Sequence, residues 1–589
     1  MKKKPPTLGR FRARARKFER QTPQVAPLYL SFLALITGII SGYGAILFRY
    51  MISFFHNLFF FGKISLEYDS TQHFVSSWGV WVILIPILGL LLSNWLTTSF
   101  APEAKGHGVP EVMYAVAEKR GRIRPIVSFI KSLASAICIG SGGSVGREGP
   151  IVQIGSSFGS SLGQLLGLRP RHVILLVGCG VAGGIAATFN APIGGVAFAI
   201  ELILPEYNLL TFMPLIISAT TATYIASAHL GTAPAFVLPE YGLVSPFEFL
   251  LYLLLGIAVA GAAILFISTL YRTEDFFDRF RLNPHLKALF GSLLLGITGY
   301  LLFRFTGNYQ IFGVGYAFIT DTLTENHLSL ILLLLLVLFK IFATSITLGA
   351  GGSGGVFAPS LFIGAGLGAA LGVIFNHFFP TLSAPPSAYA LVGMAAMVSG
   401  TTGATLTAIV MTFEMTRNYS IMLPLMLSVV AANYLVRTLY KESIYTKKLT
   451  RRGINIQFDK LISIFRITPI RTILHPEVIS VRPSDTVSYV IARGAENQLN
   501  TLPVIEEDKV LGTIHCNTIF TALPNEPIRP YVIQKEIALS IEKDCMDALE
   551  KMDAANSDLL IIQKDHRVAG VLTRSAIIRE YFRKKRTIM

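Results

Sequence analysis

One glycine-rich peptide occurs twice in the sequence and carries groups that could bind an anion. Residues 131–150 read KSLASAICIGSGGSVGREGP, and 209 residues later residues 340–359 read KIFATSITLGAGGSGGVFAP. Glycine lets backbone N–H groups approach a ligand, and the apolar sequence after each copy can start a helix. Because Arg147 is the only cation in either glycine-rich core, main-chain N–H groups and helix N-termini, each with roughly +0.5 of an elementary charge, would do most of the binding. The alternative is that the glycines only allow close helix packing.

Glu148 lies inside the first copy, where the second copy has Phe357. An ionised carboxylate beside an anion site can occupy the place of the anion, and a protonated one can swing away. Placing an ionisable acid inside a membrane costs free energy, so such a residue is taken as a candidate functional residue. We therefore predict that Glu148 is a gate and proton acceptor; the alternative is a structural salt bridge to the adjacent Arg147.

The composition shows which elements must position these residues. The 589 residues are 52% hydrophobic and 15% charged, with a mean hydropathy of +0.56, which is typical of a polytopic helical membrane protein. Several apolar segments between residues 26 and 446 are too short, too long or too glycine-rich for a simple span of ~20 residues. Two interrupted segments at matching places in two halves indicate broken helices around a transport site near the bilayer midplane.

The net charge of +16 comes largely from the two ends of this region. Residues 1–25 form a basic segment, and residues 447–452 contain four further cations. By the positive-inside bias we expect both termini in the cytoplasm and a multi-pass protein of the inner (plasma) membrane. We interpret the charge as a topology signal with some attraction to anionic lipid, not as a nucleic-acid site. The spacing of the four cysteines predicts neither disulfides nor a metal site.

The last part of the chain has an ordinary soluble composition and its own repeat. Two similar segments occur there, LPVIEEDKVLG at residues 502–512 and LLIIQKDHRVAG at residues 559–570. Each segment predicts a strand, a turn and a second strand, followed by a helix. After a linker at residues 447–468 we therefore expect two small α/β modules, at residues 469–523 and 524–585.

These motifs resemble those of the CLC family of chloride channels and chloride/proton antiporters. GHGVPE at residues 106–111, GREGP at 146–150, GVFAP at 355–359, NAPIGG at 190–195 and Tyr445 are similar to family signatures in the right order. The resemblance implies a prokaryotic-type member with a CLC fold of two inverted-topology halves, a homodimer with one anion pathway per subunit, and a CBS-domain pair as the tail.

The resemblance also implies roles for single residues. Glu148 is the gate, and the hydroxyl of Tyr445 closes the pathway from the inside. The ligand is chloride or a similar small anion, with no cofactor and no enzymatic activity. The residues that would face the anion are His107, Gly108, Gly146, Arg147, Gly149, Val356, Phe357, Ala358 and Tyr445.

Two departures from the family pattern bear on mechanism. His107 stands where chloride-handling members usually have Ser, which affects anion selectivity. Leu202 stands where exchangers commonly have the second of two glutamates, the internal proton relay, and Leu cannot carry a proton. Glu201 matches the first glutamate, and Glu206 lies one helical turn beyond Leu202. We therefore lean toward channel-like or weakly proton-coupled transport; the alternative is a chloride/proton antiporter with another relay.

Other functions fit less well. Adenine-nucleotide binding by the CBS pair is doubtful, because the second module keeps Thr573 but lacks the following Asp of the nucleotide pattern and the first lacks both. A cation transporter with a regulatory tail would need clustered oxygen ligands, and the acids of the membrane region are scattered. A fluoride exporter fits Phe357 and Tyr445 less well than a chloride protein does.

Overall fold

The computed structural model divides the chain into two compact units, Met1–Ile456 and Gln457–Met589. The division falls inside the predicted linker, and the predicted basic segment 1–25 lies outside the described residues. The structure describes residues 26–204, 209–236, 242–279, 283–324, 329–454, 465, 468–474, 479–497, 499–506, 509–533, 538–555, 557–564 and 567–588.

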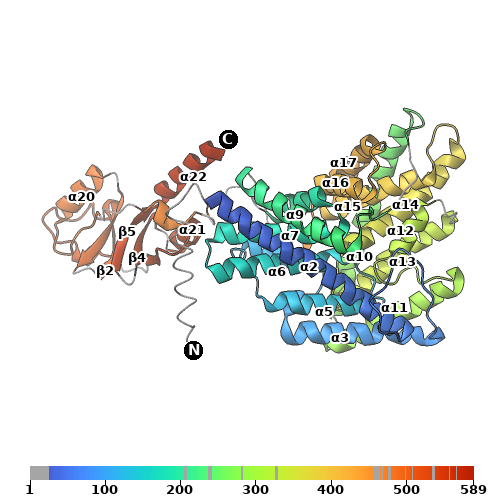
Figure 1. Ribbon diagram of the computed structural model, residues 1–589. Helices are drawn as coiled ribbons and strands as arrows, with labels where there is room; N and C mark the ends of the chain where they lie inside the picture. Colours follow the sequence, from blue (N-terminus) through green and yellow to red (C-terminus); the bar gives the residue numbers. More distant parts are fainter. Residues whose placement is uncertain are drawn as a thin grey trace. The chain divides into compact units, whose positions relative to one another are not determined.

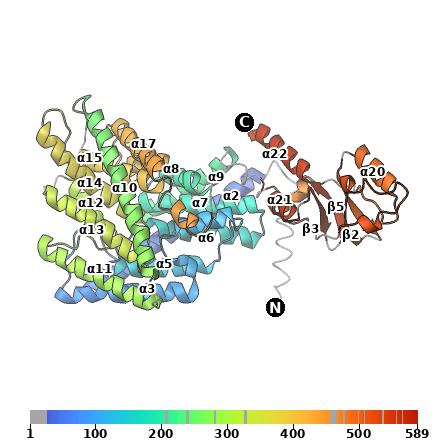
Figure 2. The same ribbon diagram turned by 180° about the vertical axis from the view of Figure 1, so that it is seen from behind.

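The first unit contains two series of helices in the same order, and both appear in Figures 1 and 2. The first series is α2 (Ala26–Phe61), α3 (Leu84–Phe100), α4 (Val109–Ala117), α5 (Ile126–Gly140), α6 (Glu148–Leu166), α7 (Pro170–Phe189), α8 (Pro192–Phe198) and α9 (Leu209–Leu230). The second is α10 (Glu248–Arg279), α11 (Pro284–Thr306), α12 (Tyr316–Leu323), α13 (Leu330–Gly349), α14 (Phe357–Phe378), α15 (Pro386–Thr402), α16 (Thr405–Thr416) and α17 (Met422–Leu439). A π-helical turn η3 (Ala199–Ile203) extends α8, and α18 (Thr446–Thr450) follows α17.

The two series also pack in the same way. The long first helix of each series packs on the sixth and eighth helices of its own half: α2 on α7 and α9, and α10 on α15 and α17. The helix that follows each glycine motif packs on the next helix, α6 on α7 and α14 on α15. Between the halves, α3 and α11 lie side by side (Figure 1). The duplication predicted from one peptide therefore extends over the whole unit.

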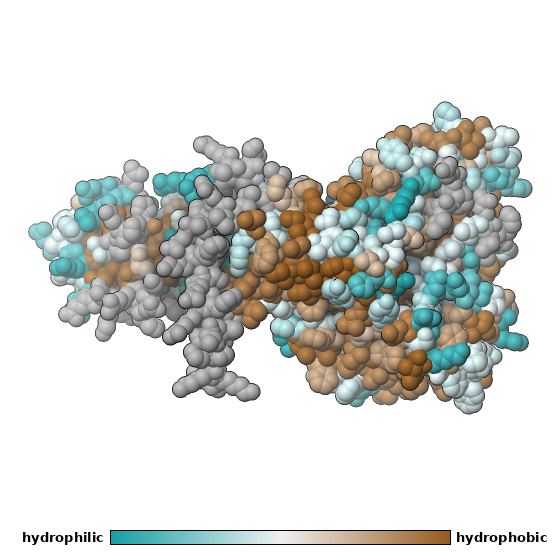
Figure 3. Space-filling model, viewed as in Figure 1, coloured by the Kyte–Doolittle hydropathy of each residue, from teal (hydrophilic) through white to brown (hydrophobic). Residues whose placement is uncertain are grey.

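The outer helices of the first unit expose large apolar side chains, as expected for helices in contact with lipid. Within the described residues, nine helices are long and apolar enough to cross a membrane, and Figure 3 shows hydrophobic side chains over α2 and α3. Leu28 and Leu47 on α2 are 72% and 62% exposed, and Leu88 on α3 is 60% exposed. By contrast, 94% of the 18 most apolar consecutive residues of α7 are buried inside the unit.

The short helices confirm the expectation of broken spans. The nine residues of α4 reach about 14 Å at ~1.5 Å per residue, about half of the ~30 Å hydrocarbon layer. The counterpart α12 has eight residues. Such helices place their termini inside the protein, where backbone groups can face a ligand.

The second unit contains two similar hairpins. Strands β1 (Thr501–Glu506) and β2 (Lys509–His515) form one, and β4 (Leu559–Lys564) and β5 (Arg567–Thr573) form the other, with a register shift near the turn in both. A short strand β3 (Ala538–Ser540) pairs with β4 in parallel. The associated helices are α20 (Val487–Glu496), α21 (Cys545–Ala554) and α22 (Arg574–Ile588).

The hairpins confirm the repeat of strand, turn and strand, but the predicted following helices differ. The second hairpin continues into α22, whereas a 3₁₀ turn at Cys516–Thr518 follows the first. Separate apolar cores lie under each hairpin, one including Val504 and Ile514, and the other including Ile561 and Leu572.

Candidate functional site

The two copies of the glycine motif meet backbone to backbone. The N–H of Gly146 donates to the carbonyl of Gly355 at 2.7 Å, and the N–H of Gly355 donates back to the carbonyl of Gly146 at 2.6 Å. Helices α6 and α14 begin two residues after this bridge, at Glu148 and Phe357. Two helix N-termini therefore start from one point, each with first-turn N–H groups that have no partner within the helix.

The glycines at this point are required by space. A Cβ atom on Gly146 would lie 2.1 Å from Oε2 of Glu148, and one on Gly149 would lie 2.1 Å from the carbonyl oxygen of His107. A Cβ on Gly355 would lie 2.7 Å from the N atom of Gly149. Real Cβ atoms essentially never come closer than 3.0 Å. Close packing and a ligand site are thus not alternatives here, because the packing is what brings the helix starts together.

The carboxylate of Glu148 lies across the two helix starts. Its side chain is 1% exposed. The hydroxyl of Tyr316 donates to Oε1 at 2.8 Å, and the backbone N–H of Ala358, in the first turn of α14, donates to Oε2 at 3.3 Å. The carboxylate of the first motif copy therefore binds to the helix start of the second.

Arg147 does not form the structural salt bridge that was the alternative for Glu148. Within the described residues no ion pair joins the two side chains. The guanidinium of Arg147 lies 5.1 Å from the ring centroid of Tyr316 and 5.9 Å from that of Phe189. Its Nη2 donates to the carbonyl of Thr188 at 3.5 Å. The cation is held beside the carboxylate by aromatic rings.

His107 and Tyr445 lie together at a second place in the site. Both side chains are 1% exposed, and their ring centroids are 6.2 Å apart. Neither ring nitrogen of His107 has a hydrogen-bond partner within the described residues. A buried imidazole normally has at least one such bond, so this side chain is available to a ligand.

A buried lysine supports the loop that carries His107. The ammonium of Lys131 donates to the carbonyls of Ala104 at 2.9 Å and Gly106 at 2.7 Å, and to the hydroxyl of Ser353 at 3.0 Å. Gly108 ends this loop as the N-cap of α4, with a φ of 79° that favours glycine. Because Ser353 belongs to the second motif copy, Lys131 ties the His107 loop to that copy.

The second half repeats this support in a region that the sequence prediction missed. The ammonium of Lys340 donates to the carbonyls of Gly313 at 3.0 Å and Ile311 at 3.3 Å. Gly313 and Gly315 precede Tyr316, the first residue of α12, just as Gly106 and Gly108 precede α4. The paired Gly-x-Gly sequences, each upstream of a motif lysine, were the signal that could have identified Tyr316.

Glu201 lies at the start of another helix. Its carboxylate accepts hydrogen bonds from the N–H of Leu406 at 3.1 Å, the N–H of Thr407 at 2.8 Å and the hydroxyl of Thr407 at 2.8 Å, and so caps α16. Glu414 on α16 accepts from the N–H groups of Ile193 and Gly194, at 3.1 and 2.6 Å, and so caps α8.

Two further positions belong to the predicted proton relay, Leu202 and Glu206. Leu202 is 6% exposed and apolar, and Glu206 lies outside the described residues. Among the side chains that the structure describes, no group of three His, Cys, Asp or Glu residues could hold a metal ion.

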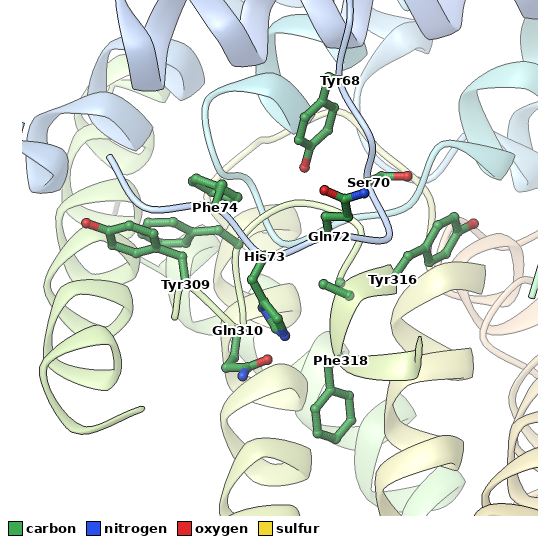
Figure 4. A pocket seen from close by; sticks show the side chains of 12 residues that line it. Tyr68, Ser70, Gln72, His73, Phe74, Tyr309, Gln310, Tyr316 and Phe318 are labelled. Atoms are coloured by element: carbon green, nitrogen blue, oxygen red, sulfur yellow. The ribbon is translucent and has the colours of Figure 1, made fainter. Parts of the chain in front are cut away.

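A small polar cavity borders α12. It measures about 20 Å³ and is lined by residues that include His73, Gln310 and Tyr316, a volume that suits about one water molecule. Figure 4 shows His73 and Gln310 close together, with the hydroxyl of Tyr316 pointing away from them. His73 Nε2 lies 2.6 Å from Oδ2 of Asp321, also on α12.

Comparison with known proteins identifies the family. A family model described as voltage gated chloride channel matches residues 89–437, and a CBS domain model matches residues 470–525. The chain belongs to the voltage-gated chloride channel (CLC) family. The resemblance seen in the sequence and the predicted CLC fold are therefore confirmed, and the protein is a multi-pass membrane member of a family of anion transporters.

Individual relatives agree with this assignment. A putative chloride channel protein ClcB-like of Ralstonia nicotianae is 35% identical over 374 residues, which cover 63% of this chain and 85% of the relative. The H(+)/Cl(-) exchange transporter ClcA of Vibrio parahaemolyticus is 32% identical over 425 residues, 68% of this chain and 88% of that protein. The crystal structure of a slow cyanobacterial Cl-/H+ antiporter has a TM-score of 0.64 and 27% identity, over 72% of this chain and 97% of that one.

Proposed function

We propose that this CLC protein moves chloride across the membrane in exchange for protons. The names of the similar ClcA protein and of the cyanobacterial structure are those of chloride/proton exchangers. They support the antiporter alternative more strongly than the channel-like transport that Leu202 suggested. Loss of the usual relay carboxylate then means another internal proton route, not the absence of coupling.

The observation that carries the proposal is the position of the Glu148 carboxylate. It accepts an N–H from the first turn of α14, where the partial positive charge of a helix start favours any anion. A chloride ion and this carboxylate would compete for one place. Ionised Glu148 therefore closes the pathway, and protonation removes the charge that holds it there, so a proton and a chloride ion exchange at one site.

A second anion place lies at His107 and Tyr445. The imidazole supplies an N–H donor that has no partner among the described residues, and the phenol of Tyr445 supplies a second donor. Without a full charge in direct contact, binding stays weak enough for release. The backbone groups proposed to face the anion are those of Gly108, Gly146, Arg147, Gly149, Val356, Phe357 and Ala358.

The internal proton route is the part of the proposal that departs from the family pattern. We assign Glu201 to capping of α16, because both of its oxygens already accept hydrogen bonds there. Leu202 cannot carry a proton. The remaining routes within this proposal are Glu206 and a chain of water molecules.

The experiment that tests exchange is chloride efflux from proteoliposomes with external pH recorded, with and without a proton ionophore. An imposed chloride gradient should drive protons uphill, and the ionophore should collapse that movement without stopping chloride. Chloride efflux with no proton movement would contradict exchange and would favour the channel-like alternative, for which Leu202 is the specific observation.

We also propose a homodimer in the inner membrane with both termini in the cytoplasm and a regulatory CBS pair. Large apolar side chains on α9 and α17 are available for a lipid or subunit contact, among them Tyr224 (77% exposed) and Tyr434 (68% exposed). In the CBS pair, Thr573 accepts from the N–H of Ala576 at 3.2 Å and so starts α22. The Asp that follows this Thr in the nucleotide pattern is missing, which supports a role without nucleotide. Cross-linking of Cys-substituted α17 faces in liposomes tests the dimer.

A further inference from the structure

We infer that Tyr316 is the latch of the Glu148 gate, a positioning residue whose hydroxyl holds the carboxylate in the place of the anion. The inference rests on the proposed gating role of Glu148. The contact that supports it is short and enclosed: Tyr316 Oη donates to Glu148 Oε1 at 2.8 Å, and the two residues are 3% and 1% exposed. Because water does not compete at such a place, the hydrogen bond contributes its full strength.

The ring of Tyr316 is fixed on two sides. The guanidinium of Arg147 lies 5.1 Å from its centroid, and the ring of Phe236 packs edge-on with the centroids 5.5 Å apart. A tyrosine held in this way loses little further conformational freedom when its hydroxyl donates. The hydroxyl is therefore aimed at Glu148 before the carboxylate arrives.

The helix that carries Tyr316 is itself anchored at both ends. Gly315, at a φ of 83°, is the N-cap of α12, and the ammonium of Lys340 donates to the carbonyl of Gly313 just before it. Toward its other end, Asp321 pairs with His73 at 2.6 Å. Figure 4 shows that the hydroxyl of Tyr316 points away from His73, so the pairing of His73 with Asp321 does not compete for the latch hydroxyl.

The duplication of the membrane unit supports a role in the pathway. Helix α12 is the counterpart of α4, each preceded by a Gly-x-Gly turn and a lysine-bound carbonyl. The turn before α4 brings His107 to Tyr445, and the first residue of α12, Tyr316, reaches Glu148. The two halves thus present one side chain each near matching helix starts, from positions that differ by two residues.

The latch has a definite sign. A phenol donates more strongly to an ionised carboxylate than to a neutral acid, so Tyr316 stabilises the ionised, closed gate. A hydrogen bond to a charged group favours the bonded form by about 10- to 100-fold. Without it, protonation and opening become easier, and the pH of half-maximal chloride flux should rise by about one to two units.

Tyr316→Phe in the full-length protein tests this, with chloride efflux from proteoliposomes measured between pH 4 and 8. The matched control is Tyr309→Phe, because Tyr309 is also buried and its hydroxyl has no hydrogen-bond partner within the described residues. We expect the half-maximal pH to rise for Tyr316→Phe and to stay unchanged for Tyr309→Phe. An unchanged value in a monodisperse Tyr316→Phe protein would overturn the latch.

A second variant separates failure of the latch from failure of the gate. In a Glu148→Gln background there is no carboxylate to hold, so adding Tyr316→Phe should change chloride flux by less than about twofold, and the two substitutions should be non-additive. If Glu148→Gln alone leaves the pH dependence intact, the proposed gate fails. If Glu148→Gln abolishes the pH dependence but Tyr316→Phe shifts nothing, only the latch fails.

Discussion

Replacing Glu201 by Ala should destabilise the junction of α8 and α16 without removing proton coupling. The carboxylate accepts three hydrogen bonds, two of them from Thr407. The N–H of Leu406 is exposed, so water replaces that bond at little loss. Loss of the N-cap to Thr407 costs about 0.5–2 kcal/mol, and loss of the charge-assisted bond from its hydroxyl costs about 1.5–3 kcal/mol. Together they lower the free energy of unfolding by about 2–5 kcal/mol.

The assay is thermal unfolding of the purified protein, followed by proton and chloride flux in proteoliposomes. At about 2 °C per kcal/mol, a value suited to larger proteins, Glu201→Ala should lower the midpoint by about 4–10 °C. Glu201→Gln keeps one acceptor oxygen and should lower it by about half as much. Both variants that remain folded should still exchange protons for chloride. A Glu201→Gln protein with an unchanged midpoint and normal chloride flux but no proton movement would refute the capping assignment and make Glu201 the relay.

Three further predictions concern the rest of the site. Gly355→Ala should abolish chloride flux, because the Cβ atom of the new alanine would lie 2.7 Å from the N atom of Gly149. In the control Gly261→Ala, the new Cβ atom has no heavy atom within 4 Å, so flux should stay unchanged. Equal flux in the two proteins would contradict the steric argument. Lys131→Met should lower the free energy of unfolding by about 1–3 kcal/mol for each buried acceptor left without a donor, because it removes the donor to two carbonyls and a hydroxyl. Thermal unfolding measures this loss, and a stability equal to that of the parent would contradict it. His107→Ala should weaken chloride binding by about tenfold, the loss of one donor bond, as measured by calorimetry, and unchanged affinity would place the anion away from His107.

The arrangement of the site could be predicted where one short peptide carries both the backbone geometry and the chemistry. The duplicated glycine motif predicted two helix starts near one point, and Gly146 and Gly355 do exchange backbone hydrogen bonds. Glu148 could be selected because the second copy has Phe357 at its position. These inferences needed only local sequence, since glycines and the residues after them determine where a helix begins.

Partners far apart in the sequence could not be predicted in this way. Tyr316 lies 168 positions from Glu148, and Glu201 is 205 positions from Leu406. Such contacts depend on how the two halves pack, which no local pattern specifies. The sequence pattern pointed to Leu202 and its neighbours as the position of the proton relay. It could not predict that Glu201 caps α16, because that contact depends on the packing of α16 against the π-helical turn that carries Glu201.

We propose that the Glu148 carboxylate closes the pathway by occupying the place of the anion. The most direct measurement is chloride efflux as a function of pH from proteoliposomes that contain Glu148→Gln protein, with proton movement recorded in parallel. Glu414→Gln is the matched control, because it neutralises another carboxylate that accepts backbone N–H groups at a helix start. We expect rapid, pH-independent chloride efflux without proton movement for Glu148→Gln, and parental behaviour for Glu414→Gln. Chloride efflux from Glu148→Gln protein that keeps the parental pH dependence and still moves protons would refute this role of Glu148.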